Sequence, residues 1–168
     1  MAETTKAAAP VALNMKRVFA VPRERLFAAF ATQEQMDHWM CRDAADHVIK
    51  CLKFDFRVGG GIETEIRTPK KDLYRMHMEF REITRPSKIS FTWGHEHVAM
   101  DGKSLGETLT GTLVTFEFHD RGDSTELELT HQFLPTRQEY DDHKQGWAGC
   151  LDKLGEFVGR GQRNDLRG

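Results

Sequence analysis

Histidines are the residues whose type and spacing could carry chemistry in this chain. The sequence contains eight, and His95-Glu96-His97 puts two of them on alternate positions, where they would share one face of a strand as a zinc or copper pair can. No third ligand is fixed by its spacing to this pair, and the segment opens a polar stretch after Trp93. We therefore expect exposed loop histidines there and no metal site.

His131 and His143 form the second pair of interest. His131 has the same alternation as Leu127 and Leu129, which predicts that it points into the core, where a neutral imidazole needs a hydrogen-bond partner. His143 lies on the apolar stripe of the last helix and would face His131 across the interior. Two interpretations stay open: the pair orients a polar group of a ligand, or both rings are satisfied within the protein, which is commoner for buried polar groups.

No nucleophile is paired with a base in any familiar motif. The chain has no GxSxG elbow, no HExxH pair and no phosphate-binding loop, and the three glycines at 59–61 lie at a strand turn. Cys41, Cys51 and Cys150 are far apart and lack CxxC spacing, so we expect reduced thiols. Cys150 would lie beside the inner stripe of the last helix, with no neighbouring cation to activate it. No motif thus singles out a catalytic residue, and the sequence predicts no cofactor and no metal.

Composition is that of an ordinary globular protein. The 168 residues are 39% apolar and 30% charged, with a net charge of −2, and the two signs are mixed along the chain. Without a basic stripe, nucleic acid is not an expected partner. No segment approaches the ~20 apolar residues of a membrane span, and residues 1–10 lack a signal-peptide core, so we expect a cytoplasmic protein without a membrane span.

A single domain over residues 12–159 is predicted between flexible tails at 1–11 and 160–168. A first strand over 12–20 precedes two short helices, one beginning at Pro22 and one after Thr32. Thr32 and Gln35 have the spacing of a capping box, so the second helix would carry Met36, Trp39 and Met40.

Strands follow through the middle of the chain. The alternation of Tyr74, Met76, Met78 and Phe80 with charged residues predicts a strand with one buried and one wet face. Similar runs lie near 48–56, 62–66, 89–93, 114–118 and 127–133, with a polar loop expected at about 95–109. The short turns between runs favour an antiparallel meander.

A long helix ends the domain. Thr136 and Glu139 form a second capping pattern, and apolar residues then recur every three or four positions through Val158. Gly146, Gly149 and Gly155 interrupt this helix, at ~1 kcal/mol each relative to alanine. They indicate a close approach by a strand or a bound molecule, and we favour close packing on the sheet.

This order of elements predicts a cavity. A bent antiparallel sheet can wrap one helix, but one helix cannot fill the whole concavity, so large side chains or a pocket must occupy the remainder. The predicted inner face is rich in methionine and aromatic residues, which suit an apolar ligand. The predicted ligand-binding residues are Trp39, Phe54, Phe56, Met76, Met78, Phe80, Phe91, Trp93, Phe116, Phe118, His131, Phe133, His143, Trp147, Cys150 and Leu151.

The order of several motifs resembles the START-related helix-grip superfamily (SRPBCC), in the branch named after the activator of the heat-shock-protein-90 ATPase. The resemblance runs from about residue 14 to 158. It rests on the segments Val21–Phe27, Met36–Trp39, Phe56–Gly60, Thr112–Phe116, Leu129–His131 and Gly146–Leu154. It implies an α+β helix-grip fold, with a curved six- to seven-stranded antiparallel sheet around the C-terminal helix and a tunnel between them. Relatives include lipid carriers, cyclases, hormone receptors and co-chaperones, so the resemblance implies a fold more than an activity.

Three functions remain open on the sequence. The leading hypothesis is a protein that binds a small hydrophobic or aromatic molecule between sheet and helix, in a stress-response or metabolite-binding role. The alternatives are a cyclase- or hydrolase-type enzyme in the same pocket, with His131 as acid or base, and a chaperone-interacting module that uses the outer surface. A small apolar molecule is the expected partner, with a chaperone or a second copy of the chain as further candidates.

Overall fold

The structure is a computed structural model that describes residues 10–40, 48–68 and 73–165. The elements, in chain order, are β1 (Val11–Phe19), α1 (Arg23–Ala31), α2 (Gln33–Met36), β2 (Val48–Phe54), β3 (Gly61–Arg67), β4 (Leu73–Thr84), β5 (Lys88–Val98), β6 (Ser104–Asp120), β7 (Thr125–Leu134) and α3 (Arg137–Asp165). Most of the predicted tail at 1–11 lies outside the described residues, and so does Cys41. None of the described helices has the length and apolar character needed to span a membrane.

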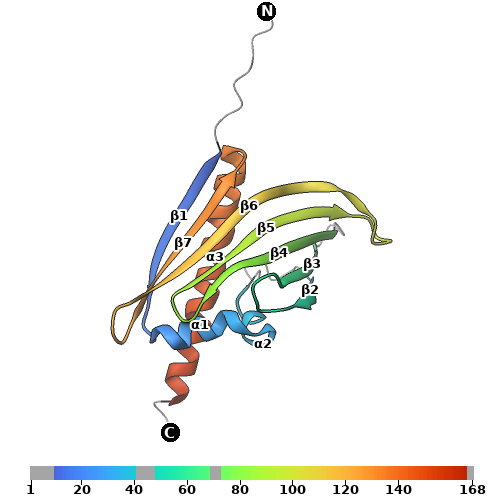
Figure 1. Cartoon of the computed structure of the whole chain (residues 1–168). Helices are drawn as coiled ribbons and strands as arrows, with labels where there is room; N and C mark the ends of the chain where they lie inside the picture. The colour runs from blue at the N-terminus through green and yellow to red at the C-terminus, as the bar shows by residue number, and fades with distance from the viewer. Residues whose placement is uncertain (1–9, 41–47, 69–72, 166–168) are drawn as a thin grey trace, which may run out of the picture.

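The strands form one antiparallel sheet in the order β1-β7-β6-β5-β4-β3-β2. Strands β2 to β7 are a simple meander, and β1 joins its far edge beside β7. The sheet curves around α3, and α1 and α2 lie near one end of it (Figure 1). The predicted α+β helix-grip fold is confirmed, with seven strands.

Both predicted capping patterns form. The Thr32 hydroxyl accepts a hydrogen bond from the Gln35 backbone N–H (3.2 Å) at the start of α2, and the Thr136 hydroxyl accepts one from the Glu139 N–H (3.0 Å) at the start of α3. Helix α1 begins at Arg23. Pro22 therefore precedes the helix in extended conformation, whereas the sequence predicted it as the first residue of the helix. Helix α2 ends at Met36, so Trp39 and Met40 lie in the turn that follows it.

The prediction of a polar loop at 95–109 is wrong. β5 continues to Val98 and β6 begins at Ser104, so most of this segment is a two-stranded ribbon. Register shifts between Trp93 and Val98 allow the ribbon to bend, and its polar side chains need no cover because water reaches them. Val98 and Leu109 are its buried apolar positions. This correction matters because it puts His95 on a strand that faces α3.

The last helix is longer than predicted. α3 runs from Arg137 to Asp165 and so enters the segment predicted as a C-terminal tail. An ion pair between Arg17 and Asp152 (2.5 Å) joins it to β1. The flexibility of the tail stays a prediction.

An aromatic cluster fills the part of the concavity next to α1. Phe30 contacts the rings of Trp39, Phe116 and Phe118, with centroids 4.6 to 5.2 Å apart. Phe80 bridges Phe56 and Phe91, at 5.0 and 5.9 Å. The edge-to-face geometry of several of these pairs is the arrangement that aromatic rings favour in cores. This end of the concavity is therefore solid core.

Phe133, which was predicted to point inward, is exposed, and so is Leu52 on β2; both exposures have a backbone cause. Phe133 has a φ of 66°, which breaks the alternation of β7: its side chain is 53% exposed and Leu134 is buried in its place. Leu52 lies where the β2–β3 register shifts between Cys51 and Lys53, and it is 40% exposed.

Candidate functional site

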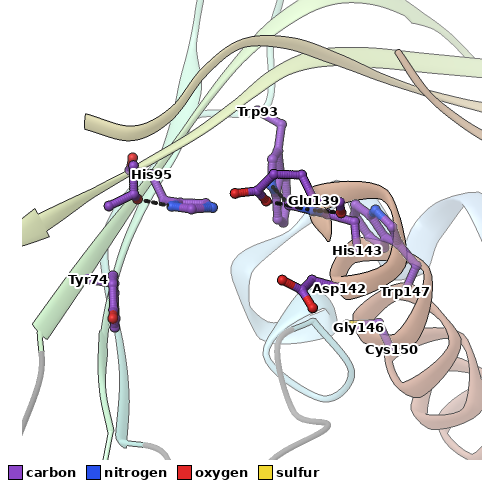
Figure 2. Close-up of a pocket in the computed structure, with 10 residues that line it drawn as sticks. Tyr74, Trp93, His95, Glu139, Asp142, His143, Gly146, Trp147 and Cys150 are labelled. Carbon is purple, nitrogen blue, oxygen red and sulfur yellow. Dashed lines mark hydrogen bonds and ion pairs between the residues drawn. The ribbon is translucent and has the colours of Figure 1, made fainter. Parts of the chain in front are cut away.

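A pocket of about 470 Å³ lies between the first turns of α3 and the facing strands β4, β5 and β6. It occupies the part of the concavity that the aromatic cluster leaves open. Figure 2 shows Tyr74 and His95 on the strand side, opposite the side chains of α3. The residues that line it are Tyr74, Trp93, His95, Thr108, Glu139, Asp142, His143, Gly146, Trp147 and Cys150.

The structure brings together only some of the predicted ligand-binding residues. Trp93, His143, Trp147 and Cys150 line the pocket. Phe54 and Phe56 pack partly buried against the core, and Phe133 points to solvent. The other predicted residues are buried core residues that do not line it: Trp39, Met76, Met78, Phe80, Phe91, Phe116, Phe118, His131 and Leu151. Phe54 and Met78 border a separate void of only about 20 Å³.

Trp93 and Trp147 form one wall of the pocket, the tryptophan wall, and His131 lies against both of their rings with its two ring nitrogens hydrogen-bonded. The Trp147 indole N–H donates to its Nδ1 (3.2 Å), so the proton is on Nε2, which donates to the Thr112 hydroxyl (2.9 Å). Thr112 in turn donates to the Trp93 carbonyl. This chain satisfies every polar atom of a ring that is 0% exposed.

Burial keeps His131 neutral. Desolvation, the largest cause, and the nearby rings of His143 and His95 together lower its pKa to about 3. A role as general acid or base would require one of its two hydrogen bonds to break and a path to the pocket that it does not line. The acid/base role stays a prediction.

His143 faces His131, as predicted, with ring centroids 4.9 Å apart. The Trp93 indole N–H donates to its Nε2 (3.3 Å), so Nδ1 carries the proton and donates to the Glu139 backbone carbonyl one turn earlier (2.7 Å). The Glu139 carboxylate lies 3.4 Å from the same Nδ1. His143 is thus the polar link between the tryptophan wall and the start of α3.

His95 enters the pocket from β5. The Thr108 hydroxyl donates to the His95 backbone carbonyl (3.0 Å) and therefore accepts a hydrogen bond from the Nδ1–H of the same residue. Burial, the larger cause, and the nearby ring of His143 together lower the pKa of His95 to about 4. Its ring lies nearly parallel to that of His143, with centroids 6.1 Å apart.

Tyr74, His95, Thr108, Glu139, Asp142 and Gly146 line the pocket but are not among the predicted ligand-binding residues. Tyr74 shares the alternation of Met76, and Glu139 lies four residues before His143, so the sequence contained a signal for both. His95 and Thr108 were hidden by the loop expected at 95–109. Gly146 stood out as a costly helix glycine, and an added Cβ there would meet no atom within 4 Å because it faces the pocket.

A curved antiparallel sheet that grips a long C-terminal helix, with a pocket between the two, defines the START-related helix-grip class of proteins. The sequence matches the family described as "Activator of Hsp90 ATPase homolog 1-like protein" over residues 20–159. The chain therefore belongs to this family. A comparison with curated protein sequences finds no match.

Solved bacterial structures share the fold. A Rhizobium loti protein is 24% identical with a TM-score of 0.71, the match covering 88% of this chain and 96% of that one. A Silicibacter pomeroyi protein named AHSA1 is 22% identical with a TM-score of 0.69, covering 89% and 98%. A Chromobacterium violaceum protein is 20% identical with a TM-score of 0.71, covering 88% and 96%. At these identities the similarity establishes the fold alone.

Proposed function

We propose that this protein binds a small hydrophobic or aromatic molecule in the pocket between the sheet and α3. The observation that carries the proposal is the wall made by Trp93 and Trp147, whose rings lie 4.9 Å apart on the pocket. Both indole N–H groups already donate to histidine nitrogens of the protein. What the wall offers a ligand is therefore apolar ring surface, suited to a flat apolar or aromatic group.

Much of the rest of the pocket lining is polar. His95, Thr108, Glu139 and Asp142 offer nitrogen and oxygen atoms there. An apolar wall with a few convergent polar groups is typical of small-molecule sites, and about 470 Å³ lies within the ~300–1,000 Å³ range of such pockets. The expected ligand is amphipathic, with its flat part on the tryptophans and a hydrogen-bonding group toward His95 and Glu139.

The three tryptophans provide a direct test. Trp39 donates its indole N–H to the Ala29 carbonyl (2.8 Å) in the solid core, whereas Trp93 and Trp147 line the pocket. We expect a small-molecule extract of the protein's own cells, added to ¹⁵N-labelled protein, to shift the indole N–H resonances of Trp93 and Trp147. The Trp39 resonance is the internal reference and should stay in place.

A matched pair of variants locates the binding. Gly146→Phe puts a large side chain into the pocket, while Gly159→Phe changes the same residue type on the same helix at another site with open space. We expect the indole shifts to vanish in Gly146→Phe and to persist in Gly159→Phe. Equal shifts in both variants would contradict the proposed site.

The other functions considered from the sequence are not favoured by a specific contact. An enzyme that uses His131 would have to free a ring whose nitrogens both have partners. A chaperone partner would use the surface, so its binding should not respond to Gly146→Phe. A cytoplasmic location fits the proposal and stays part of it.

A further inference from the structure

Three potential metal ligands meet among the polar groups of the pocket. His95 on β5 and Glu139 and His143 on α3 each present one ligand atom, and these atoms all lie within 4.8 Å of one another. The three side chains approach from opposite sides of the pocket (Figure 2). This cluster differs from the sequence motif His95-Glu96-His97. It shares only His95 with that motif, and its other two members, Glu139 and His143, lie at the start of the last helix.

The spacing is close to that of a coordinated ion. Zinc–nitrogen and zinc–oxygen bonds of about 2.0–2.1 Å put tetrahedral ligand atoms about 3.4 Å apart. The Glu139 carboxylate and His143 Nδ1 already lie 3.4 Å apart. The remaining separations need to shorten by at most about 1.4 Å from the 4.8 Å limit, and Glu139, whose side chain is 26% exposed, has room to turn.

His95 has the hydrogen-bond partner that a metal-binding histidine needs. Thr108 accepts from His95 Nδ1–H, which leaves the Nε2 lone pair of His95 free toward the pocket. Partners of this kind fix the ring orientation and tautomer of metal ligands. At His143 the ion would take the place of the Nδ1 proton, which the ring now donates to the Glu139 carbonyl.

We propose that His95, Glu139 and His143 bind a divalent transition-metal ion of the Zn²⁺ class. Two imidazoles and one carboxylate are a ligand set that zinc accepts, with its remaining position open to a water or a bound molecule. That position faces the pocket, where the ion would offer a Lewis-acidic anchor to an oxygen or nitrogen of a ligand.

Metal binding has a readout inside the site. A neutral imidazole has one lone-pair nitrogen, and His143 now uses it to accept from Trp93. An ion on either nitrogen of His143 takes that lone pair, so the Trp93–His143 hydrogen bond must break. The hydrogen bond of Trp147 to His131 does not involve the ion, and its resonance serves as the reference.

The test is a Zn²⁺ titration of the chelator-treated full chain by calorimetry, with the indole N–H resonances followed in parallel. We expect one ion per chain and a shift of the Trp93 resonance larger than that of Trp147. Glu139→Gln, which keeps the backbone cap, and His95→Asn should each weaken binding at least about 10-fold. Thr108→Val, which removes only the support of His95, should weaken it about 10-fold.

A second cluster supplies the control. Glu117, His119 and Glu128 also present ligand atoms within 4.8 Å of one another. They lie at partly exposed strand positions away from the pocket. His119→Asn should leave Zn²⁺ binding unchanged. The proposal is overturned if the wild-type protein takes up no Zn²⁺, if folded Glu139→Gln and His95→Asn bind it as tightly as wild type, or if the loss follows His119→Asn.

Discussion

His131 organises the wall of the pocket without lining it. Its Nδ1 accepts a hydrogen bond from the indole N–H of Trp147, and its Nε2–H donates to the hydroxyl of Thr112. That hydroxyl in turn donates to the backbone carbonyl of Trp93. The two tryptophans are thereby fixed relative to each other by one buried chain of hydrogen bonds. A fixed wall lowers the entropy that a ligand must lose on binding, because the protein side is already ordered.

Thr112→Val tests this chain of hydrogen bonds. Valine has nearly the same shape, but it leaves the Nε2–H of His131 and the carbonyl of Trp93 without their partner. An unsatisfied buried polar group costs about 1–3 kcal/mol, so the free energy of unfolding should fall by that amount in urea denaturation.

Thr115→Val is the matched control for that experiment. Thr115 lies on the same strand with the opposite alternation and is only half buried. We expect its free energy of unfolding to stay within about 0.5 kcal/mol of wild type. Equal effects of the two substitutions would contradict the role given to Thr112.

Stability should fall in acid because of His131. Its pKa is about 3 in the folded protein against 6.5 when free, so between these values the unfolded chain binds a proton that the folded chain does not. The free energy of unfolding therefore declines as the pH falls from about 6.5 toward 3, by roughly 3–5 kcal/mol at full extent.

His131→Gln isolates this contribution. Glutamine retains one donor and one acceptor but cannot be protonated, whereas the neighbouring His143, His95 and Glu139 are the same in both proteins. Denaturation at a series of pH values from 7 to about 3.5 should give a shallower decline in the variant. Parallel curves would show that His131 does not carry the pH dependence.

At the scale of elements, two glycines of α3 have different surroundings. Gly146 opens onto the pocket, whereas a Cβ added at Gly155 would lie 3.5 Å from the Phe19 ring. The sequence favoured close packing as the reason for the helix glycines; at Gly155 the distance of an added Cβ to Phe19 is an ordinary van der Waals contact, so that reason stays a prediction. An added Cβ at Gly146 would meet open space, which fits the other explanation given from the sequence, the approach of a bound molecule.

Gly146→Ala should stabilise the protein. A Cβ there meets nothing within 4 Å, and replacing an interior helix glycine by alanine gains about 0.5–1 kcal/mol. Gly155→Leu should instead destabilise it, because the larger side chain meets Phe19. Thermal melts of both variants check the pair, and a destabilised Gly146→Ala would indicate that this helix position is not open.

The ribbon formed by β5 and β6 explains why the sequence revealed only part of the site. Alternation and turns predicted most strands because buried apolar positions repeat every second residue there. At 95–109 the polar side chains face water or the pocket, so the apolar signal disappears although the backbone pairs as a sheet. His95 and Thr108 lie in this segment, and their place in the site depends on pairing that composition does not reveal.

At the scale of the whole molecule, the concavity has two unlike halves. Near α1 and α2 the phenylalanines and Trp39 fill it, and near the start of α3 it stays open with a mixed polar and apolar lining. The order of elements was enough to predict a helix gripped by a curved sheet and leftover volume. Which half of that volume is filled depends on the packing of particular rings, so most of the predicted ligand residues proved to be core.

Native mass spectrometry of the protein purified from its own cells tests the central claim, that the open half holds a small molecule. We predict an added mass in the wild-type protein that disappears on denaturation, is absent from Gly146→Phe and remains in Gly159→Phe. A bare wild-type mass, or the same added mass in Gly146→Phe, would contradict the claim.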